Sequence, residues 1–420
     1  KILTGLLLVL IGGWGSLSAQ SAGSNYARQV NTLIGTKGVG LTSGYLYPGA
    51  TYPYGMVQFT PSYFSKRSGF VINQLSGGGC EHMGNFPTFP VKGKLKMSPD
   101  NILNYRINIS EEKGHAGYYE AKVQEDIHAK LTVTERTGMA SYEYPADQQY
   151  GTVIIGGGIS ATPIEQAAIV ITAPNKCEGY AEGGNFCGLR TPYKVYFVAE
   201  FDTDALESGT WKRNELKPNT TFAEGEYSGV YFTFDVNKKK NIQYKIGVSY
   251  VSVENARENL KTENSGWDFL QIQNQAESKW NHYLGKIEVE GSNPDRTTQF
   301  YTHLYRSFIH PNVCSDVNGE YMGADFRVHK SRSKHYTSFS NWDTYRTQIQ
   351  LLSILDPEVA SDIVISHQLF AEEAGGAFPR WVMANIETGV MQGDPTPILI
   401  SNAYAFGARN YDPKPIFKTM

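Results

Sequence analysis

The sequence has no excess of charge of either sign. Lys and Arg together number 38 against 41 Asp and Glu, so the net charge of the 420-residue chain is only -3. Proteins whose main partner is nucleic acid carry a basic stripe or patch, and none is visible here. We therefore expect no nucleic acid partner.

Long hydrophobic runs are also scarce. The apolar segment 6–11 is too short to form a membrane span. A basic first residue precedes it and small residues, including Ser18 and Ala19, follow it, which is typical of a secretory signal peptide. We expect a signal peptide over residues 1–19, no membrane span in the mature chain, and export to the periplasm, the cell surface or the medium.

Cysteine is rare, and the metal-binding spacings CxxC and HExxH are both absent. In an oxidising compartment, Cys177 and Cys187 are close enough in sequence to close the short loop CEGYAEGGNFC with a disulfide. The alternative is four free thiols, and for Cys80 and Cys314 we expect free thiols.

Hydrophobic residues alternate with polar ones over much of the first half of the chain. In IHAKLTVTE, for example, Ile127, Ala129, Leu131 and Val133 share one face. This period of two, with turn-rich segments between the runs and no helical pattern, predicts half-buried strands in an antiparallel β-sandwich over residues 25–255.

The period then becomes helical. Residues 256–290 predict a helical linker. Two further helices carry start signals, with Asn293 before Pro294 in one and Asp356 before Pro357 in the other.

Successive helices joined by polar loops, over residues 291–420, predict the beginning of an α/α repeat. We expect one of these helices to begin at the motif SNWDTYRTQIQLLSIL and to run to Leu355, and another to begin at Pro397. A closed toroid of six helix hairpins needs about 300 residues. Either this region is a small open bundle, or the sequence is a fragment of a longer enzyme, which is the alternative we expect.

Trp342 and Asp343 stand together at the start of that helical motif. An aromatic plane packs on the apolar face of a sugar, and a carboxylate forms strong hydrogen bonds to its hydroxyls. Three alternatives need no ligand: an Asp that caps the helix, a Trp in the core, and an ion pair of Asp343 with Arg346.

Two loops offer further candidates. The loop PRWVMANIETGVMQGDP carries Trp381 and Glu387, although solvated acids in a Gly- and Pro-rich connection explain it equally well. The loop LSGGGCEHMGNFPTFP displays Cys80, His82 and Asn85 beside three glycines that permit close approach of a ligand. It lacks the ending of a phosphate-binding loop, and no base is identifiable that would activate Cys80 as a nucleophile.

These motifs, with VNTLIGTKG, YPGATYPYGMVQFTP and SNAYAFGAR in the same order, resemble family 92 glycoside hydrolases, the exo-acting α-mannosidases. The resemblance implies an N-terminal β-sandwich, a helical linker and an (α/α)6 catalytic domain. It implies Ca²⁺-dependent, inverting removal of terminal α-linked mannose from a mannose-containing oligosaccharide or a glycoprotein glycan. In the family, the acid, the base and most calcium ligands lie later in the catalytic domain, so we expect them beyond Met420 and expect this piece alone to be inactive.

By the same resemblance, Asp343 binds hydroxyls of the terminal mannose and Trp342 shapes that pocket. The loop with Cys80, His82 and Asn85 reaches over the site near the leaving sugar, and Glu387 belongs to the active-site face. Two other classes remain open: a secreted carbohydrate-binding protein without catalysis, and another (α/α)6 carbohydrate enzyme such as a phosphorylase.

Overall fold

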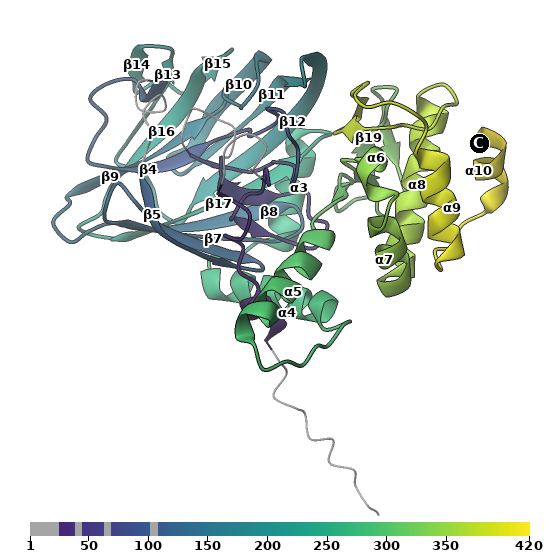
Figure 1. The fold of residues 1–420 in the computed structure, drawn as a ribbon. Coiled ribbons are helices and arrows are strands. Elements are labelled where there is room, and N and C mark those ends of the chain that lie inside the picture. Colours follow the sequence, from purple (N-terminus) through teal and green to yellow (C-terminus); the bar gives the residue numbers. More distant parts are fainter. Residues whose placement is uncertain (1–24, 38–43, 63–68, 101–107) are drawn as a thin grey trace, which may run out of the picture.

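A computed structural model describes residues 25–37, 44–62, 69–100 and 108–420. The predicted signal peptide lies outside these described residues. The chain forms two parts side by side, a β-sheet part and a helical part (Figure 1). The change from strands to helices falls between Ser249 and Val253.

The first part is a sandwich of two antiparallel sheets, as predicted. One sheet has eight strands in the spatial order β1-β2-β3-β4-β9-β16-β13-β14. Its strands are β1 Ala50–Thr51, β2 Gln58–Pro61, β3 Phe70–Val71, β4 Thr88–Lys92, β9 Tyr150–Gly156, β13 Glu207–Lys212, β14 Glu215–Pro218 and β16 Ser228–Asp235.

The other sheet has nine strands in the order β15-β10-β11-β12-β17-β8-β7-β6-β5. In β7, the predicted inner face of Ile127, Ala129, Leu131 and Val133 is fully buried, because side chains of one strand point alternately to the core and away from it. The strands are β5 Ile109–His115, β6 Tyr118–Val123, β7 Ile127–Val133, β8 Thr137–Glu143, β10 Ile164–Ala173, β11 Lys176–Phe186, β12 Leu189–Phe201, β15 Phe222–Glu224 and β17 Asn241–Ser249.

The second part is mainly helical and contains three small antiparallel pairs, β18-β21, β19-β20 and β22-β23. The helices are α1 Tyr26–Gln29, α3 Val253–Glu263, α4 Phe269–Leu284, α5 Pro294–Ser307, α6 Asn341–Thr344, α7 Gln348–Leu355, α8 Pro357–Glu373, α9 Thr396–Ala405 and α10 Pro413–Thr419. The short strands are β18 Asn312–Val313, β19 Glu320–Met322, β20 Val328–Lys330, β21 Tyr336–Thr337, β22 Val382–Met383 and β23 Ile386–Glu387.

The predicted helix starts at Pro294 and Pro357 are confirmed. The Asn293 side chain accepts hydrogen bonds from the backbone N–H groups of the first turn of α5, and the Asp356 side chain caps α8 in the same way. The single helix predicted from Trp342 to Leu355 is wrong. The helix is interrupted between α6 and α7, where Thr347 has φ -149° and ψ -28°, outside the helical region.

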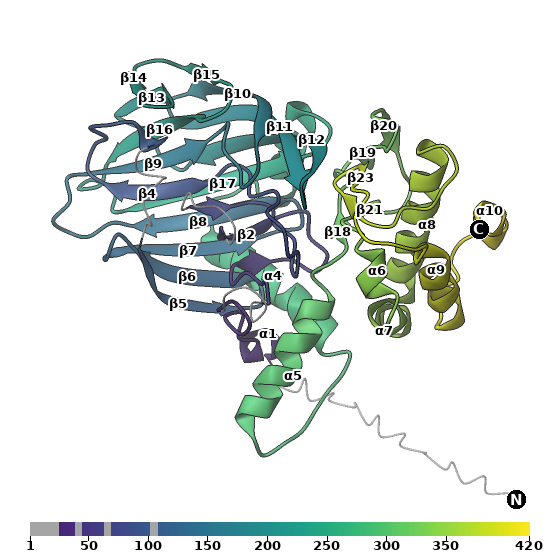
Figure 2. The same ribbon diagram turned by 45° about the horizontal axis from the view of Figure 1, so that its top comes forward.

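Tyr54 joins the two parts of the molecule. Its backbone N–H donates to the carbonyl oxygen of Phe308 at 2.8 Å, and its carbonyl accepts from the N–H of Val313 at 2.8 Å. Its buried ring packs edge-on against Tyr283, Phe308 and Tyr336. Further along the boundary, the start of β12 approaches β23 (Figure 2). Backbone bonds and aromatic packing together set how the helices lie against the sandwich.

No helix within the described residues has both the length and the apolar character needed to cross a lipid bilayer.

Candidate active site

A cleft of about 540 Å³ opens between the sandwich and the helical part. The sandwich contributes the glycine-rich loop 75–80 and the tip of the β11–β12 hairpin. The helical part contributes the segment 338–344 around α6, the segment after α5, and Trp381. This volume lies within the range of about 300–1,000 Å³ that is usual for small-molecule sites.

The glycine-rich loop is held by two histidines. His82 Nε2 accepts a hydrogen bond from the backbone N–H of Leu75 at 2.8 Å, and its Nδ1 lies 2.7 Å from the carbonyl oxygen of Cys80. His310, which follows α5, accepts from the N–H of Ser76 at 2.7 Å. Burial lowers the pKa of both imidazoles to about 4, so both are neutral at pH 7 and their Nε2 atoms remain acceptors.

Gly78 packs directly on His82. A Cβ at this position would stand 2.8 Å from Cε1 of the imidazole, whereas a Cβ on Gly79 would meet nothing closer than the Tyr45 ring at 3.8 Å. We expect Gly78→Ala to lower the free energy of unfolding by about 1–3 kcal/mol through overpacking. Urea unfolding measures this change, and Gly79→Ala is the matched control with an expected effect within ~0.5 kcal/mol. Equal effects of the two substitutions would contradict the close contact of Gly78 with His82.

The disulfide considered between Cys177 and Cys187 is not formed, and the free thiol expected at Cys80 is wrong, whereas the one expected at Cys314 is confirmed. Cys177 is near the start of β11 and points into the core, while Cys187 follows the other end of this 11-residue strand. An extended strand of that length separates its ends by roughly 30 Å, so the two sulfurs cannot meet. Cys187 is bonded to Cys80 instead, and Cys177 and Cys314 are free and buried.

Asp343 lies in the wall of the cleft and is exposed. It is the third residue of the four-residue helix α6 rather than its N-cap, so the capping alternative does not apply. The hydroxyl of Ser340 donates to its carboxylate and holds it in place. Arg346 forms no ion pair with it in the structure; its guanidinium lies 4.7 Å from the centre of the Trp342 ring.

Trp381, not Trp342, lies in the wall of the cleft. Trp342 is half-buried beneath Arg346 and is not among the wall residues. The segment 339–341 pairs with the backbone of residues 380–382, which brings Trp381 beside the start of α6. The Trp381 indole stacks on Phe186 from the β11–β12 hairpin, with ring centres 4.3 Å apart.

Three of the predicted binding residues lie behind the wall. Glu387 accepts hydrogen bonds from the backbone N–H groups of Arg380 at 2.7 Å and Trp381 at 3.3 Å, so its carboxylate positions Trp381 instead of facing the cleft. Asn85 is buried and bonded to Asn73, and His82 is buried beneath the glycine-rich loop. Among the six predicted residues, the structure places only Cys80 and Asp343 in the wall.

The floor of the cleft is closed by buried side chains. Leu352, Ile363, His367 and Leu399 line it, and each is at most 2% exposed. Asn341 fixes the floor to the surrounding loops, because its amide donates to the carbonyl oxygen of Pro379 at 3.1 Å and lies 3.0 Å from His367 Nε2. These buried residues form the side of the cleft that faces α7, α8 and α9.

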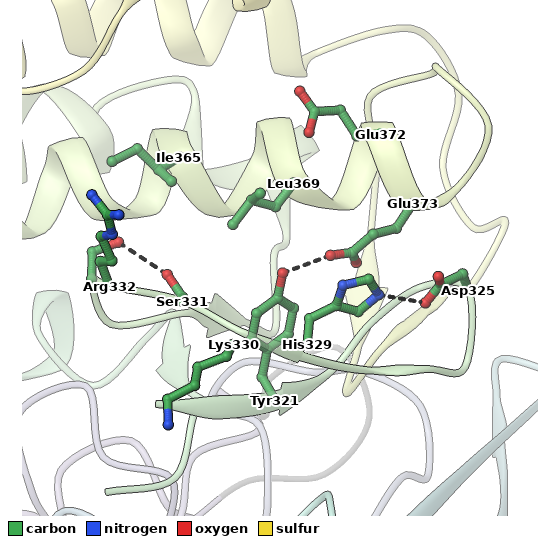
Figure 3. A pocket seen from close by; sticks show the side chains of 11 residues that line it. Tyr321, Asp325, His329, Lys330, Ser331, Arg332, Ile365, Leu369, Glu372 and Glu373 are labelled. Atoms are coloured by element: carbon green, nitrogen blue, oxygen red, sulfur yellow. Dashed lines mark hydrogen bonds and ion pairs between the residues drawn. The ribbon is translucent and has the colours of Figure 1, made fainter. Parts of the chain in front are cut away.

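A second hollow of about 660 Å³ lies between α8 and the β19–β20 hairpin (Figure 3). Two pairs of its polar side chains are already bonded to each other. The Tyr321 hydroxyl donates to Glu373 at 2.6 Å, and His329 lies 2.9 Å from Asp325. We therefore favour the cleft between the two parts, where the Asp343 carboxylate is exposed, as the functional site.

Comparison with known families decides the identity of the chain. Residues 29–249 match the N-terminal domain of glycosyl hydrolase family 92, and residues 255–420 match the catalytic domain of the same family. The chain belongs to glycosyl hydrolase family 92.

Individual relatives of this family 92 chain are distant in sequence. A protein from Arthroderma benhamiae described as an uncharacterized secreted glycosidase is 26% identical over 363 residues, which cover 76% of this chain and 45% of that protein. A family GH92 α-mannosidase from Bacteroides thetaiotaomicron has a TM-score of 0.86 at 24% identity, covering 94% of this chain and 56% of the other. A family GH92 inverting mannosidase from the same organism has a TM-score of 0.84 at 25% identity, covering 96% and 55%. The family 92 chain thus spans about half the length of these relatives.

The described residues of this family 92 chain include no group of three or more His, Cys, Asp or Glu side chains that could hold a metal ion. Ca²⁺ takes six to eight oxygen ligands. The described residues therefore do not fit a calcium site by themselves.

Sequence reasoning missed several wall residues. His310 and Phe186 carry no motif of their own, and each reaches the cleft through contacts between distant segments. A signal existed for Phe186 and Cys187, because NFCG lies between two alternating strands and so predicts a hairpin tip. Asn341 stands directly before Trp342 in the quoted motif, yet its burial was not evident from the sequence.

Proposed function

We propose that this family 92 chain is part of an exo-acting α-mannosidase whose terminal mannose occupies the cleft between the sandwich and the helices. The observation that carries the proposal is the position of Asp343, an exposed carboxylate in the wall of a pocket of sugar size. The two similar Bacteroides structures are described as mannosidases, one of them as inverting, which supports the choice of substrate and mechanism.

The shape of the cleft supports exo action. Its floor is lined by buried side chains such as Ile363 and His367, an arrangement suited to receiving the end of a glycan. Asp343 is held by the hydroxyl of Ser340 and offers further carboxylate lone pairs to sugar hydroxyls. Trp381 is a wall residue, but its indole is buried and stacked on Phe186, so we assign it to shaping the wall and not to stacking on the sugar.

Inversion needs two carboxyl groups about 6.5–9.5 Å apart, one as the acid and one as the base that activates water. Asp343 is the one carboxylate among the described wall residues. We therefore assign it to substrate binding and assign neither acid nor base within this chain. Calcium dependence remains a prediction from the family resemblance; when bound, such an ion would act as a Lewis acid on sugar hydroxyls.

The substrate class follows from the same argument. We propose a mannose-containing oligosaccharide or glycoprotein glycan that is met outside the cytoplasm. The relative from Arthroderma benhamiae is described as secreted, and the signal pattern of residues 1–19 agrees with export.

The test is the stereochemistry of the first product. Protein expressed from the complete reading frame should hydrolyse an aryl α-mannoside, and ¹H NMR during the first minutes should show β-mannose before mutarotation produces the α-anomer. An aryl α-glucoside, which differs at the C2 hydroxyl, is the substrate control and should be hydrolysed far more slowly. Release of α-mannose first, or equal rates on both glycosides, would contradict the proposal.

A carbohydrate-binding protein without catalysis is the second candidate. The observation that favours it is the single carboxylate among the described wall residues. The same protein would then bind methyl α-mannoside in calorimetry and would release no aryl alcohol from the aryl α-mannoside.

A further inference from the structure

The tip of the β11–β12 hairpin contains a cysteine in an unfavourable backbone conformation. Cys187 and Gly188 form the two-residue turn between the paired residues Phe186 and Leu189, and both have positive φ, +51° and +86°. Such type I′ turns favour Asn, Asp or Gly at the first central position, and another residue there costs roughly 1–2 kcal/mol. The disulfide of Cys187 is therefore attached to the central residue of a tight turn, where the backbone has little freedom to move.

The partner of Cys187 lies at the far end of the glycine-rich loop. The disulfide joins Cys80 to Cys187 across 107 residues of sequence. The beginning of the loop is already fixed, because the N–H of Ser76 bonds to His310 and the N–H of Gly77 donates to the carbonyl oxygen of Tyr45 at 2.9 Å. The disulfide fixes the other end of the loop to the hairpin.

The hairpin tip is in turn attached to the helical part. Phe186, next to Cys187, stacks on Trp381, and Glu387 holds the backbone of Trp381. On the other side of the turn, Leu189 approaches Gly389 of the loop after β23. The glycine-rich loop, the hairpin tip and Trp381 therefore form one continuous wall that crosses the boundary between the two parts of the molecule.

This wall is at the mouth of the cleft. Gly77 and Gly79 are exposed, whereas the residues of the floor are buried. A terminal sugar seated on the floor would leave the next sugar of the glycan, the aglycone, beside this wall.

We propose that the Cys80–Cys187 disulfide is a positioning element that holds the glycine-rich loop against the hairpin tip and thereby shapes the part of the cleft that receives the aglycone sugar. This inference rests on the proposed mannosidase function. If the disulfide has this role, the affinity for an extended glycan depends on whether the Cys80–Cys187 bond is formed or reduced. The affinity for a single mannoside does not depend on it.

The experiment compares two ligands in two redox states. Dissociation constants for methyl α-mannoside and for an S-linked α-mannobiose, whose thioglycosidic bond resists hydrolysis, are measured by calorimetry on protein from the complete reading frame, first oxidised and then reduced with dithiothreitol. The reagent breaks the S–S bond, leaves two thiols and is itself oxidised to its cyclic disulfide. Reduction is expected to weaken mannobiose binding about tenfold and to leave methyl α-mannoside binding unchanged within about twofold.

Variants provide the matched controls. Cys80→Ser/Cys187→Ser should bind both ligands as the reduced protein does, in the presence or absence of dithiothreitol. Cys177→Ala changes a free cysteine on the same strand β11 and should keep the full redox response. Phe186→Ala keeps the disulfide but removes the stack on Trp381, and it is expected to weaken the binding of mannobiose selectively. This variant tests the inference if the double cysteine variant does not fold.

The outcomes separate this inference from the proposed function. Methyl α-mannoside binding with an unchanged mannobiose affinity after reduction would overturn the positioning role and leave the mannosidase proposal standing. Equal weakening of both ligands would also overturn it, because the disulfide would then support the whole cleft. If the oxidised protein binds neither ligand and hydrolyses no mannoside, the proposed function itself fails.

Discussion

Replacing Asp343 by Asn is expected to lower kcat/KM for an α-mannoside by about 10-fold to 150-fold in protein from the complete reading frame. The carboxylate lies exposed in the cleft wall and is held by the Ser340 hydroxyl, so it is poised to accept hydrogen bonds from sugar hydroxyls. A hydrogen bond to a charged group contributes about 1.5–3 kcal/mol. Losing one raises the activation free energy by that amount, which corresponds to a decrease in kcat/KM of about 10-fold to 150-fold. The asparagine keeps the size of the side chain but removes the charge and replaces one acceptor with a donor.

Steady-state kinetics on an aryl α-mannoside measure the effect. Asp295→Asn is the matched control, because Asp295 is also an exposed acid in the first turn of a helix, α5, and is not among the wall residues of the cleft. The kcat/KM of Asp295→Asn should stay within about twofold of the value for the unsubstituted protein. Unchanged kinetics for Asp343→Asn would remove this residue from the sugar site.

Acidification is expected to unfold the protein before pH 4. Burial lowers the pKa of His82 and His367 to about 4 and of His335 to about 3. Each imidazole is neutral in the fold and becomes protonated on unfolding once the pH is below its unfolded pKa of about 6.5. The stability that they support is therefore complete above pH 6.5 and is lost as the pH falls through the folded pKa values.

The expected loss in the free energy of unfolding is large enough to unfold the protein. Each unit of pKa difference corresponds to about 1.4 kcal/mol, so three such histidines together remove roughly 10 kcal/mol. This is comparable with the whole stability of an ordinary protein, about 5–15 kcal/mol. Asp362 acts in the opposite direction, because burial raises its pKa to about 6 and the folded state retains that proton longer.

Urea unfolding between pH 7 and pH 5 measures the effect. The free energy of unfolding should fall as the pH is lowered. His367→Gln should reduce the steepness of that fall by about 1.4 kcal/mol per pH unit, the contribution of one proton. His303→Gln, at an exposed position on α5, is the control and should leave the slope unchanged. A free energy of unfolding that does not change with pH in this range would contradict the neutral buried state of these imidazoles.

The fold was accessible from the sequence because local signals agree with it. The alternation in residues 127–133 reports directly which side of β7 is buried, and a Pro after an Asn or Asp cap marks the start of α5 and of α8. The break between α6 and α7 was not predicted, because the apolar spacing from Tyr345 to Leu355 is compatible with one uninterrupted helix. The pairing of residues 339–341 with residues 380–382 constrains this segment, and no local pattern encodes it.

The candidate site was accessible only in part. Asp343 lies in the wall of the cleft, whereas Trp342, two positions after the Ser340 bridge, packs beneath Arg346. The disulfide was not predicted correctly because proximity in sequence suggested closure of the eleven-residue loop CEGYAEGGNFC, whereas strand β11 separates Cys177 at its start from Cys187 just after its end. Which distant segments meet at the cleft depends on packing between the sandwich and the helices, and this information is not local.

A crystal structure of the chain soaked with methyl α-mannoside tests the central proposal most directly. The sugar is expected between Asp343 and the glycine-rich loop, with at least one hydroxyl within hydrogen-bonding distance of the Asp343 carboxylate. A mannoside found instead in the hollow between α8 and the β19–β20 hairpin, with the cleft between the two parts empty, would contradict the account.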